Sequence, residues 1–120
     1  MPDTVLITTH DLEPAVKLRD AFEAAGYDVE LLTAAEHIGD VKDPVLLIIT
    51  GGLEEKRARR LLREAYERDR LPVIALVDTP VEASPESRAR YGVSDALVKP
   101  IDISEVLVVE IGRASCRERV

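Results

Sequence analysis

The stretch VLLIITGG, residues 45–52, contains the most apolar run at the centre of the chain. Such a run is typical of a fully buried strand, and the two glycines after it predict a turn. In open α/β sheets, binding and catalytic residues lie where the strands end. This strand end has no Asp, Glu, His, Ser or Cys, and its one polar side chain is Thr50. The question is therefore which chemistry this position supports.

Strands and helices alternate on both sides of this stretch. Hydrophobic patterns predict strands at residues 4–9, 28–33, 44–50, 71–77 and 95–98. They predict helices at residues 12–25, 34–38, 53–69 and 85–91, and a last helix from Asp102. Alternation of this kind favours right-handed βαβ units and a doubly wound parallel sheet covered on both faces, which is an α/β fold.

Two helices carry further sequence signals. The helix at 53–69 has one charged face, and its other face is predicted to be apolar through Ala58, Leu61, Leu62, Ala65 and Tyr66. The triplet Ser84-Pro85-Glu86 predicts a helix start, because Ser caps the helix, Pro fits its first position and an acid suits its first turn. Gly92 predicts the end of that helix.

Composition limits the classes of function. The chain has 120 residues, which suits one domain, and 46% of them are hydrophobic. A net charge of −7 and 3% aromatic residues disfavour direct contact with nucleic acid or with an anionic membrane. No secretory signal or membrane span is predicted, so we expect a cytoplasmic protein. The one cysteine, Cys116, has no metal-ligand spacing.

The last ten residues, IGRASCRERV, differ from the rest of the chain. They are rich in arginine, have no helical period, and resemble a translated sequencing adapter. We therefore expect residues 1–110 to form the domain and residues 111–120 to be a non-native tail. On this interpretation the last helix is truncated near Glu110, and the natural protein continues beyond it.

Three stretches together resemble the receiver domain of two-component response regulators, the CheY-like domain. They are LRDAFEAAGYDVELLTA (residues 18–34), LPVIALV (71–77) and GVSDALVKPID (92–102). The resemblance extends over residues 3–110. It implies a flavodoxin-like (βα)5 sheet with strand order 2-1-3-4-5 and a site at the carboxyl ends of the strands.

The resemblance also implies a phosphorylation site. In the family an Asp at the end of strand 3 accepts a phosphoryl group from a histidine kinase, and two acids after strand 1 hold Mg²⁺. A Thr or Ser after strand 4 and a Lys after strand 5 contact the phosphoryl oxygens. Chemically this is attack by a carboxylate, assisted by a hard cation and a fixed positive charge.

Most of these positions have lost their chemistry in this chain. The acid pair falls on Thr9 and His10, which are poor Mg²⁺ ligands, and Asp11 is a single neighbouring carboxylate. The phosphoacceptor falls within residues 48–50, which contain no acid. The strand-4 hydroxyl falls on Val77, and the aromatic position of strand 5 falls on Ala96. Only the lysine remains, as Lys99 followed by Pro100.

Several alternatives stay open at these residues. Thr50 is either a substitute phosphoacceptor activated by His10 or a hydroxyl that caps the strand and its turn, and the second interpretation is favoured. His10 and Asp11 with His37 lack the spacing of a metal site. Lys99 is either a relict anion clamp, acting with Gly51 and Gly52, or a structural lysine paired with Asp11 or Asp78. We also expect the Lys99–Pro100 bond to be cis, as in the resembling family.

The sequence therefore predicts a signalling module that has lost phosphorylation. Its degenerate pocket comprises Thr9, His10, Asp11, Thr50, Val77 and Lys99. No catalytic residue, metal or cofactor is expected, and the chain is not expected to be an enzyme. The expected partners are proteins: an output domain in the same chain, a histidine kinase or a second receiver. The natural protein is expected to be a longer transcriptional regulator or kinase. The alternative is a flavodoxin-like domain that binds a small ligand or an anion.

Overall fold

The five predicted strands form one parallel sheet. The computed structural model describes residues 3–9, 12–32, 44–50, 56–67, 71–78, 83–99, 104 and 106. The strands are β1 (Thr4–Thr8), β2 (Asp28–Leu32), β3 (Pro44–Ile49), β4 (Val73–Val77) and β5 (Asp95–Val98). Their order is β2-β1-β3-β4-β5, and every neighbouring pair is parallel. The predicted α/β fold and strand order are confirmed.

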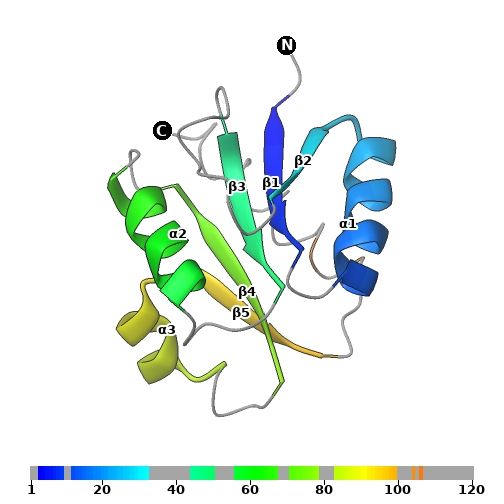
Figure 1. Ribbon diagram of the computed structural model, residues 1–120. Coiled ribbons are helices and arrows are strands. Elements are labelled where there is room, and N and C mark those ends of the chain that lie inside the picture. Colours follow the sequence, from blue (N-terminus) through cyan, green and yellow to red (C-terminus); the bar gives the residue numbers. More distant parts are fainter. Residues whose placement is uncertain are drawn as a thin grey trace, which may run out of the picture.

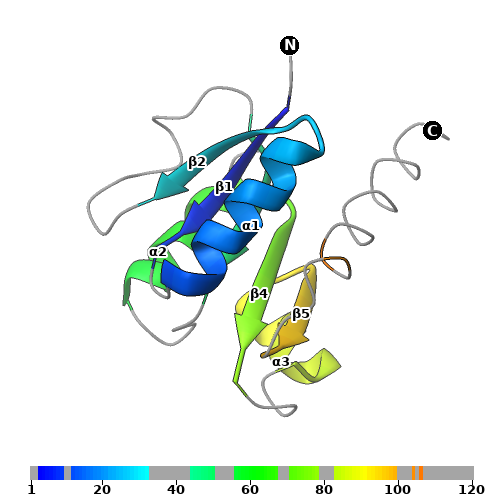
Figure 2. The ribbon, with the colours of Figure 1, turned by 90° about the vertical axis from the view of Figure 1, so that its right-hand side faces the viewer.

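Helices cover both faces of the sheet. They are α1 (Leu12–Ala24), α2 (Lys56–Glu67) and α3 (Pro85–Tyr91). Figures 1 and 2 show α1 on one face and α2 with α3 on the other. Ser104 and Val106 are helical, in agreement with a last helix after β5. The helix predicted at 34–38 and the tail at 111–120 lie outside the described residues.

Alternation along the strands divides the core into two apolar layers. In β3, Leu47 and Ile49 face α2, whereas Leu46 and Ile48 face α1. Phe22 of α1 is fully buried in the second layer and meets Tyr27 edge to face, with ring centroids 5.5 Å apart. The central strands of the sheet are buried on both faces and therefore carry continuous apolar runs. This explains why the stretch at 45–50 does not alternate between apolar and polar residues.

Three sequence predictions need correction. Tyr66 was expected on the apolar face of α2, but 66% of it is exposed because it lies at the edge of the helical stripe. The predicted strand at 71–77 begins only at Val73, because Pro72 has no N–H to donate to the sheet. Thr9 and Thr50 follow the last residues of β1 and β3 instead of ending them.

The predicted ends of α3 are confirmed. The Ser84 hydroxyl accepts a hydrogen bond from the Ser87 N–H at 3.2 Å, and Pro85 is the first helical residue. Gly92 ends the helix in the left-handed conformation, with φ of 72°, and its N–H donates to the Arg88 carbonyl. No residue of α3 is buried, so this short helix depends on its caps more than on packing.

Candidate functional site

The carboxyl ends of the strands lie together at one edge of the sheet, the lower edge in Figure 1. β1 and β3 are neighbours there, with Ile7 opposite Ile48. β4 and β5 are also neighbours, with Val77 opposite Val98. The sheet therefore brings four of the six predicted pocket residues to one edge: Thr9, Thr50, Val77 and Lys99. The other two, His10 and Asp11, lie outside the described residues.

Thr50 is bound to Thr8 of the neighbouring strand. The Thr50 N–H donates to Thr8 Oγ1 at 3.0 Å, and Thr50 Oγ1 donates to the Thr8 carbonyl at 2.9 Å. The two hydroxyl oxygens are 3.1 Å apart. Thr50 is fully buried and only 5% of Thr8 is exposed. We call this arrangement the threonine clasp.

The clasp bears on the two interpretations of Thr50. A phosphoacceptor hydroxyl needs an accessible oxygen and a base to remove its proton. Here the Thr50 hydroxyl is buried and directs its proton to a backbone carbonyl. Its geometry is that of a hydroxyl that joins the ends of β1 and β3, and it agrees with the favoured structural role.

Thr9 also bonds to the backbone. Its N–H and its hydroxyl both donate to the carbonyl of Leu32, each at 3.1 Å. These bonds join the end of β1 to the end of β2, on the side of β1 away from β3. A neutral hydroxyl used in this way offers little to Mg²⁺, which prefers charged oxygen ligands.

Lys99 pairs with Asp78, one of the two carboxylates predicted as its partner. Lys99 Nζ lies 3.8 Å from Asp78 Oδ1, and the backbone N–H of Lys99 donates to the Val77 carbonyl at 2.8 Å. The lysine side chain is 21% exposed, whereas that of Asp78 is 75% exposed. This ion pair gives the surviving lysine a carboxylate of its own chain, and so it does not favour the anion-binding alternative. The bond between Lys99 and Pro100 lies outside the described residues.

Val77 contributes only apolar surface at this edge. It is 3% exposed and belongs to the layer that packs against α2 and α3. Among the described residues there is also no group of three or more His, Cys, Asp or Glu side chains that could hold a metal ion. The described part of the site thus joins the strand ends through hydrogen bonds and pairs Lys99 with Asp78.

Sequence reasoning missed Thr8. A hydroxyl next to the end of a strand predicted to be buried was the available signal, since a buried hydroxyl needs a hydrogen-bond partner. Its partner is 42 positions away in the chain. Identifying it required the register between β1 and β3, which hydrophobic patterns do not supply.

Comparison with known proteins supports the fold. No model of a protein family matches the sequence. No curated protein matches it either. In contrast, 79 chains of solved structures match the structure.

Three of these structures illustrate the likeness. A CheY-like response regulator receiver domain protein from Methanospirillum hungatei JF-1 is 19% identical, with a TM-score of 0.76, over 99% of this chain and 98% of that one. DrrB, an OmpR/PhoB homologue from Thermotoga maritima, is 19% identical with a TM-score of 0.75, over 98% of this chain and 54% of DrrB. The BeF3-activated DrrB receiver domain is 19% identical with a TM-score of 0.71, over 94% of this chain and 97% of that one. The chain has the fold of receiver domains, and the expected resemblance is confirmed at that level.

Proposed function

We propose that this chain is a regulatory module of the receiver type that works without phosphorylation of an aspartate. The fold of receiver domains supports the signalling role. The threonine clasp is the observation that carries the rest. At the ends of β1 and β3, beside Thr9 and within the window of residues 48–50 to which the resemblance assigns acids, two hydroxyls are buried against each other and the backbone.

The chemistry of phosphoryl transfer explains why the clasp matters. The transferring group needs a nucleophile, a divalent cation and a fixed positive charge around it. The clasp puts neutral, hydrogen-bonded oxygens where the nucleophile would act. Lys99, the cation that the resembling family uses, lies 3.8 Å from Asp78 and pairs with it. Both features favour a module that is not an enzyme and has no cofactor.

A module without this chemistry must act through contacts with other proteins. We propose that the domain regulates a linked output domain, within a longer transcriptional regulator or kinase, or that it pairs with a histidine kinase or a second receiver. The matched part of DrrB is 54% of that protein, which gives an example of this fold within a longer chain. In the described part of this chain, no helix is long and apolar enough to cross a membrane. We propose a cytoplasmic location, where such regulators act.

Acetyl phosphate with Mg²⁺ tests the proposal. The chain is incubated with both and its intact mass is measured, with the DrrB receiver domain as the positive control. We expect no phosphoryl adduct on this chain under conditions in which the control is modified. A stoichiometric, acid-labile adduct would refute the proposal, and peptide mapping would identify the acceptor.

A further inference from the structure

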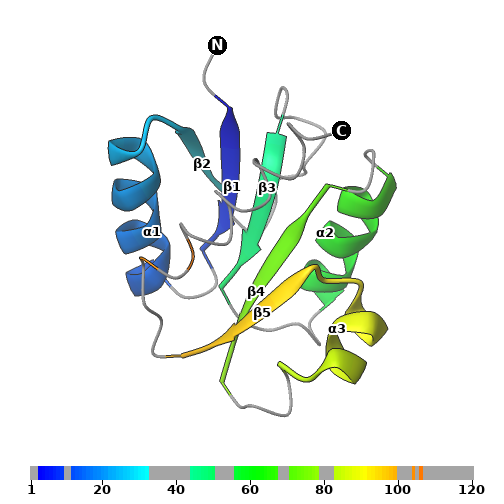
Figure 3. The same cartoon turned by 180° about the vertical axis from the view of Figure 1, so that it is seen from behind.

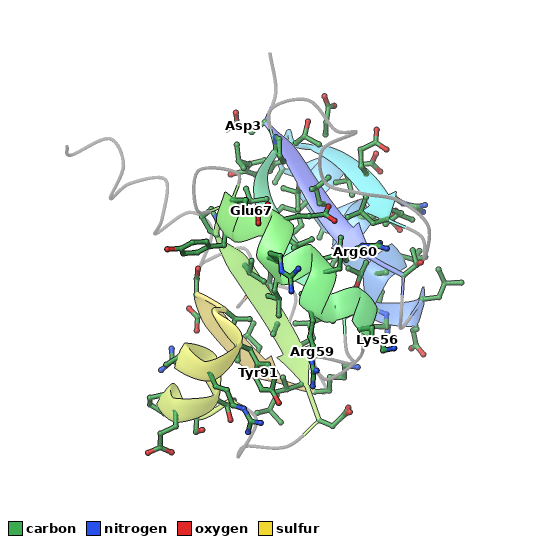
Figure 4. The ribbon with its side chains drawn as sticks, turned by 60° about the vertical axis from the view of Figure 1, so that its left-hand side comes forward. Asp3, Lys56, Arg59, Arg60, Glu67 and Tyr91 are labelled. Atoms are coloured by element: carbon green, nitrogen blue, oxygen red, sulfur yellow. The ribbon has the colours of Figure 1, made fainter. Side chains whose placement is uncertain are left out.

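The surface between α2 and α3 is hollowed. The two helices lie side by side on the same face of the sheet in Figures 1 and 3. The hollow has a volume of about 380 Å³ and is lined by Arg59 and Leu62 of α2 and by Arg90 and Tyr91 of α3. In Figure 4, Arg59 extends from α2 toward the side where Tyr91 lies. This hollow is separate from the strand ends that form the degenerate pocket.

The two helices are basic in an acidic protein. Residues 56–67 and 85–91 contain seven Lys or Arg and three Glu, a net charge of +4. The whole chain carries −7, so the remaining residues carry −11. A concentration of positive charge against the overall sign gives this face its own electrostatic preference, for anionic groups.

The two arginines of the hollow have no acidic partner among the residues that the structure describes. In the same two helices, Arg60 pairs with Glu64 at 3.4 Å, and Arg88 pairs with Asp95 at 3.8 Å. Within the described part of the chain, neither Arg59 nor Arg90 forms an ion pair. The Arg90 guanidinium lies over the Tyr91 ring, 5.5 Å from its centre, which is a cation–π contact and not an ion pair.

The floor of the hollow is apolar. Leu62 and Tyr91 are partly buried and pack against the core layer beneath α2 and α3. An apolar floor between two guanidinium groups matches an aliphatic side chain that has carboxylates on either side. Arg is suited to this role because its planar fork binds a carboxylate through two parallel hydrogen bonds.

We propose that the hollow between α2 and α3 docks an acidic segment of a partner protein, with an aliphatic side chain on Leu62 and Tyr91 and carboxylates on Arg59 and Arg90. The inference rests on the proposed function, because a module that acts through contacts needs a docking face. The lining of the hollow favours a protein over a nucleic acid. A phosphate backbone would not contact the apolar floor, and it would face a surface that is acidic elsewhere.

A second copy of the chain fits the hollow less well. Among the described helices, α1 carries exposed acids that a second copy could present to the hollow. They are already paired, since Glu13 contacts Lys17 at 3.2 Å and Asp20 contacts Arg19 at 3.3 Å. Charge complementarity therefore points to a different, more acidic segment.

A designed peptide tests the inference. The blocked peptide Gly-Asp-Glu-Leu-Glu-Asp-Gly is added to the full chain, and the backbone amides are followed by heteronuclear NMR. We expect saturable shifts concentrated in α2 and α3. Replacing the leucine of the peptide by glycine should weaken binding by about tenfold, because the apolar contact is lost.

Variants of the chain supply the controls. Arg59→Gln and Arg90→Gln should each weaken binding by about tenfold, because each removes a charge-assisted hydrogen bond. Arg63→Gln removes the same charge from the exposed face of α2 but does not line the hollow. It should weaken binding by less than about threefold, as expected for a screened surface charge. The thermal unfolding of all three variants should match that of the parent chain.

Four outcomes would overturn the inference. Two concern the peptide: no saturable binding at about 1 mM peptide, or equal losses of peptide affinity in the Arg59→Gln and Arg63→Gln variants. Two point to another partner: tighter binding of a single-stranded oligonucleotide of about 12 nucleotides than of the peptide, or a dimer in sedimentation velocity that Arg59→Gln dissociates. None of these bears on the reaction with acetyl phosphate. Failure of the docking face and failure of the phosphorylation-independent function are thus distinguished.

Discussion

Thr8 and Thr50 show how two buried hydroxyls can join the ends of neighbouring strands. Each threonine uses its side chain to bond the other residue's backbone, which links strand ends that lie 42 positions apart in the chain. Carboxylates in the same buried place would need compensating cations, since an unpaired buried charge is costly. Neutral hydroxyls that bond to each other and to the backbone avoid that cost.

A double-mutant cycle tests the clasp. Thr50→Val should lower the free energy of unfolding by about 1 kcal/mol, because one buried hydrogen bond is lost. Thr8→Val should cost more, about 1–3 kcal/mol, because the buried N–H of Thr50 loses its acceptor. Denaturant unfolding measures both. The double variant should cost less than the sum of the two single changes, because the residues share their bonds. Strict additivity would show that the two threonines act independently.

At the residue scale, the sequence alone offered Asp11 or Asp78 as the partner of Lys99, and the structure shows the pair with Asp78. It did not predict the clasp or the hollow, because both depend on residues that the sheet brings together from distant segments. Arg59 and Arg90 lie on different helices, and nothing in the sequence around either one indicates that they line the same hollow.

At the scale of elements, α3 is the part whose stability depends most on local chemistry. It has seven residues and no buried side chain, yet it carries Arg90 and Tyr91 of the hollow. Its start at Ser84 and its end at Gly92 were predictable, because caps are local and residue-specific. In α2 the exposure of Tyr66 was not predictable, because a residue at the edge of an apolar stripe faces solvent or core according to the packing around it.

Substitutions at the two ends of α3 test this dependence. Ser84→Ala removes the acceptor of the Ser87 N–H and should cost about 1 kcal/mol. Gly92→Ala should cost about as much, roughly 1 kcal/mol, because φ is 72° there. No atom lies within 4 Å of an added Cβ at Gly92, so this second cost comes from the backbone alone. Both are measured by chemical denaturation, with the exposed Glu86→Gln as control. If Glu86→Gln lowered the free energy of unfolding by as much, the roles of Ser84 and Gly92 as helix caps would be contradicted.

At the scale of the whole molecule, the fold was predictable because the alternation of strands and helices covers the chain and favours a parallel sheet with helices on both faces. The strand order came from the resemblance to receiver domains, and the structure confirms it. The charge distribution was not predictable. The net charge of −7 does not indicate that α2 and α3 form a basic face, because only the fold puts these two helices side by side.

Deletion of residues 111–120 tests the division of the chain into a domain and a tail. Both described core layers are made of residues up to Val106. We therefore expect the shortened chain to keep its circular dichroism spectrum and to melt within about 4 °C of the full chain, a difference of roughly 1 kcal/mol. Loss of the cooperative transition would show that the tail belongs to the domain.

The central claim is that the strand ends of this receiver-like fold do not accept a phosphoryl group. Beryllofluoride with Mg²⁺, added during heteronuclear NMR of the full chain, tests it most directly, because this phosphoryl mimic reports on the site without a covalent reaction. We expect no saturable shift in the amides of Thr8, Thr50, Val77 and Lys99, while the DrrB receiver domain responds under the same conditions. Saturable shifts centred on Thr50 and Lys99 would contradict it.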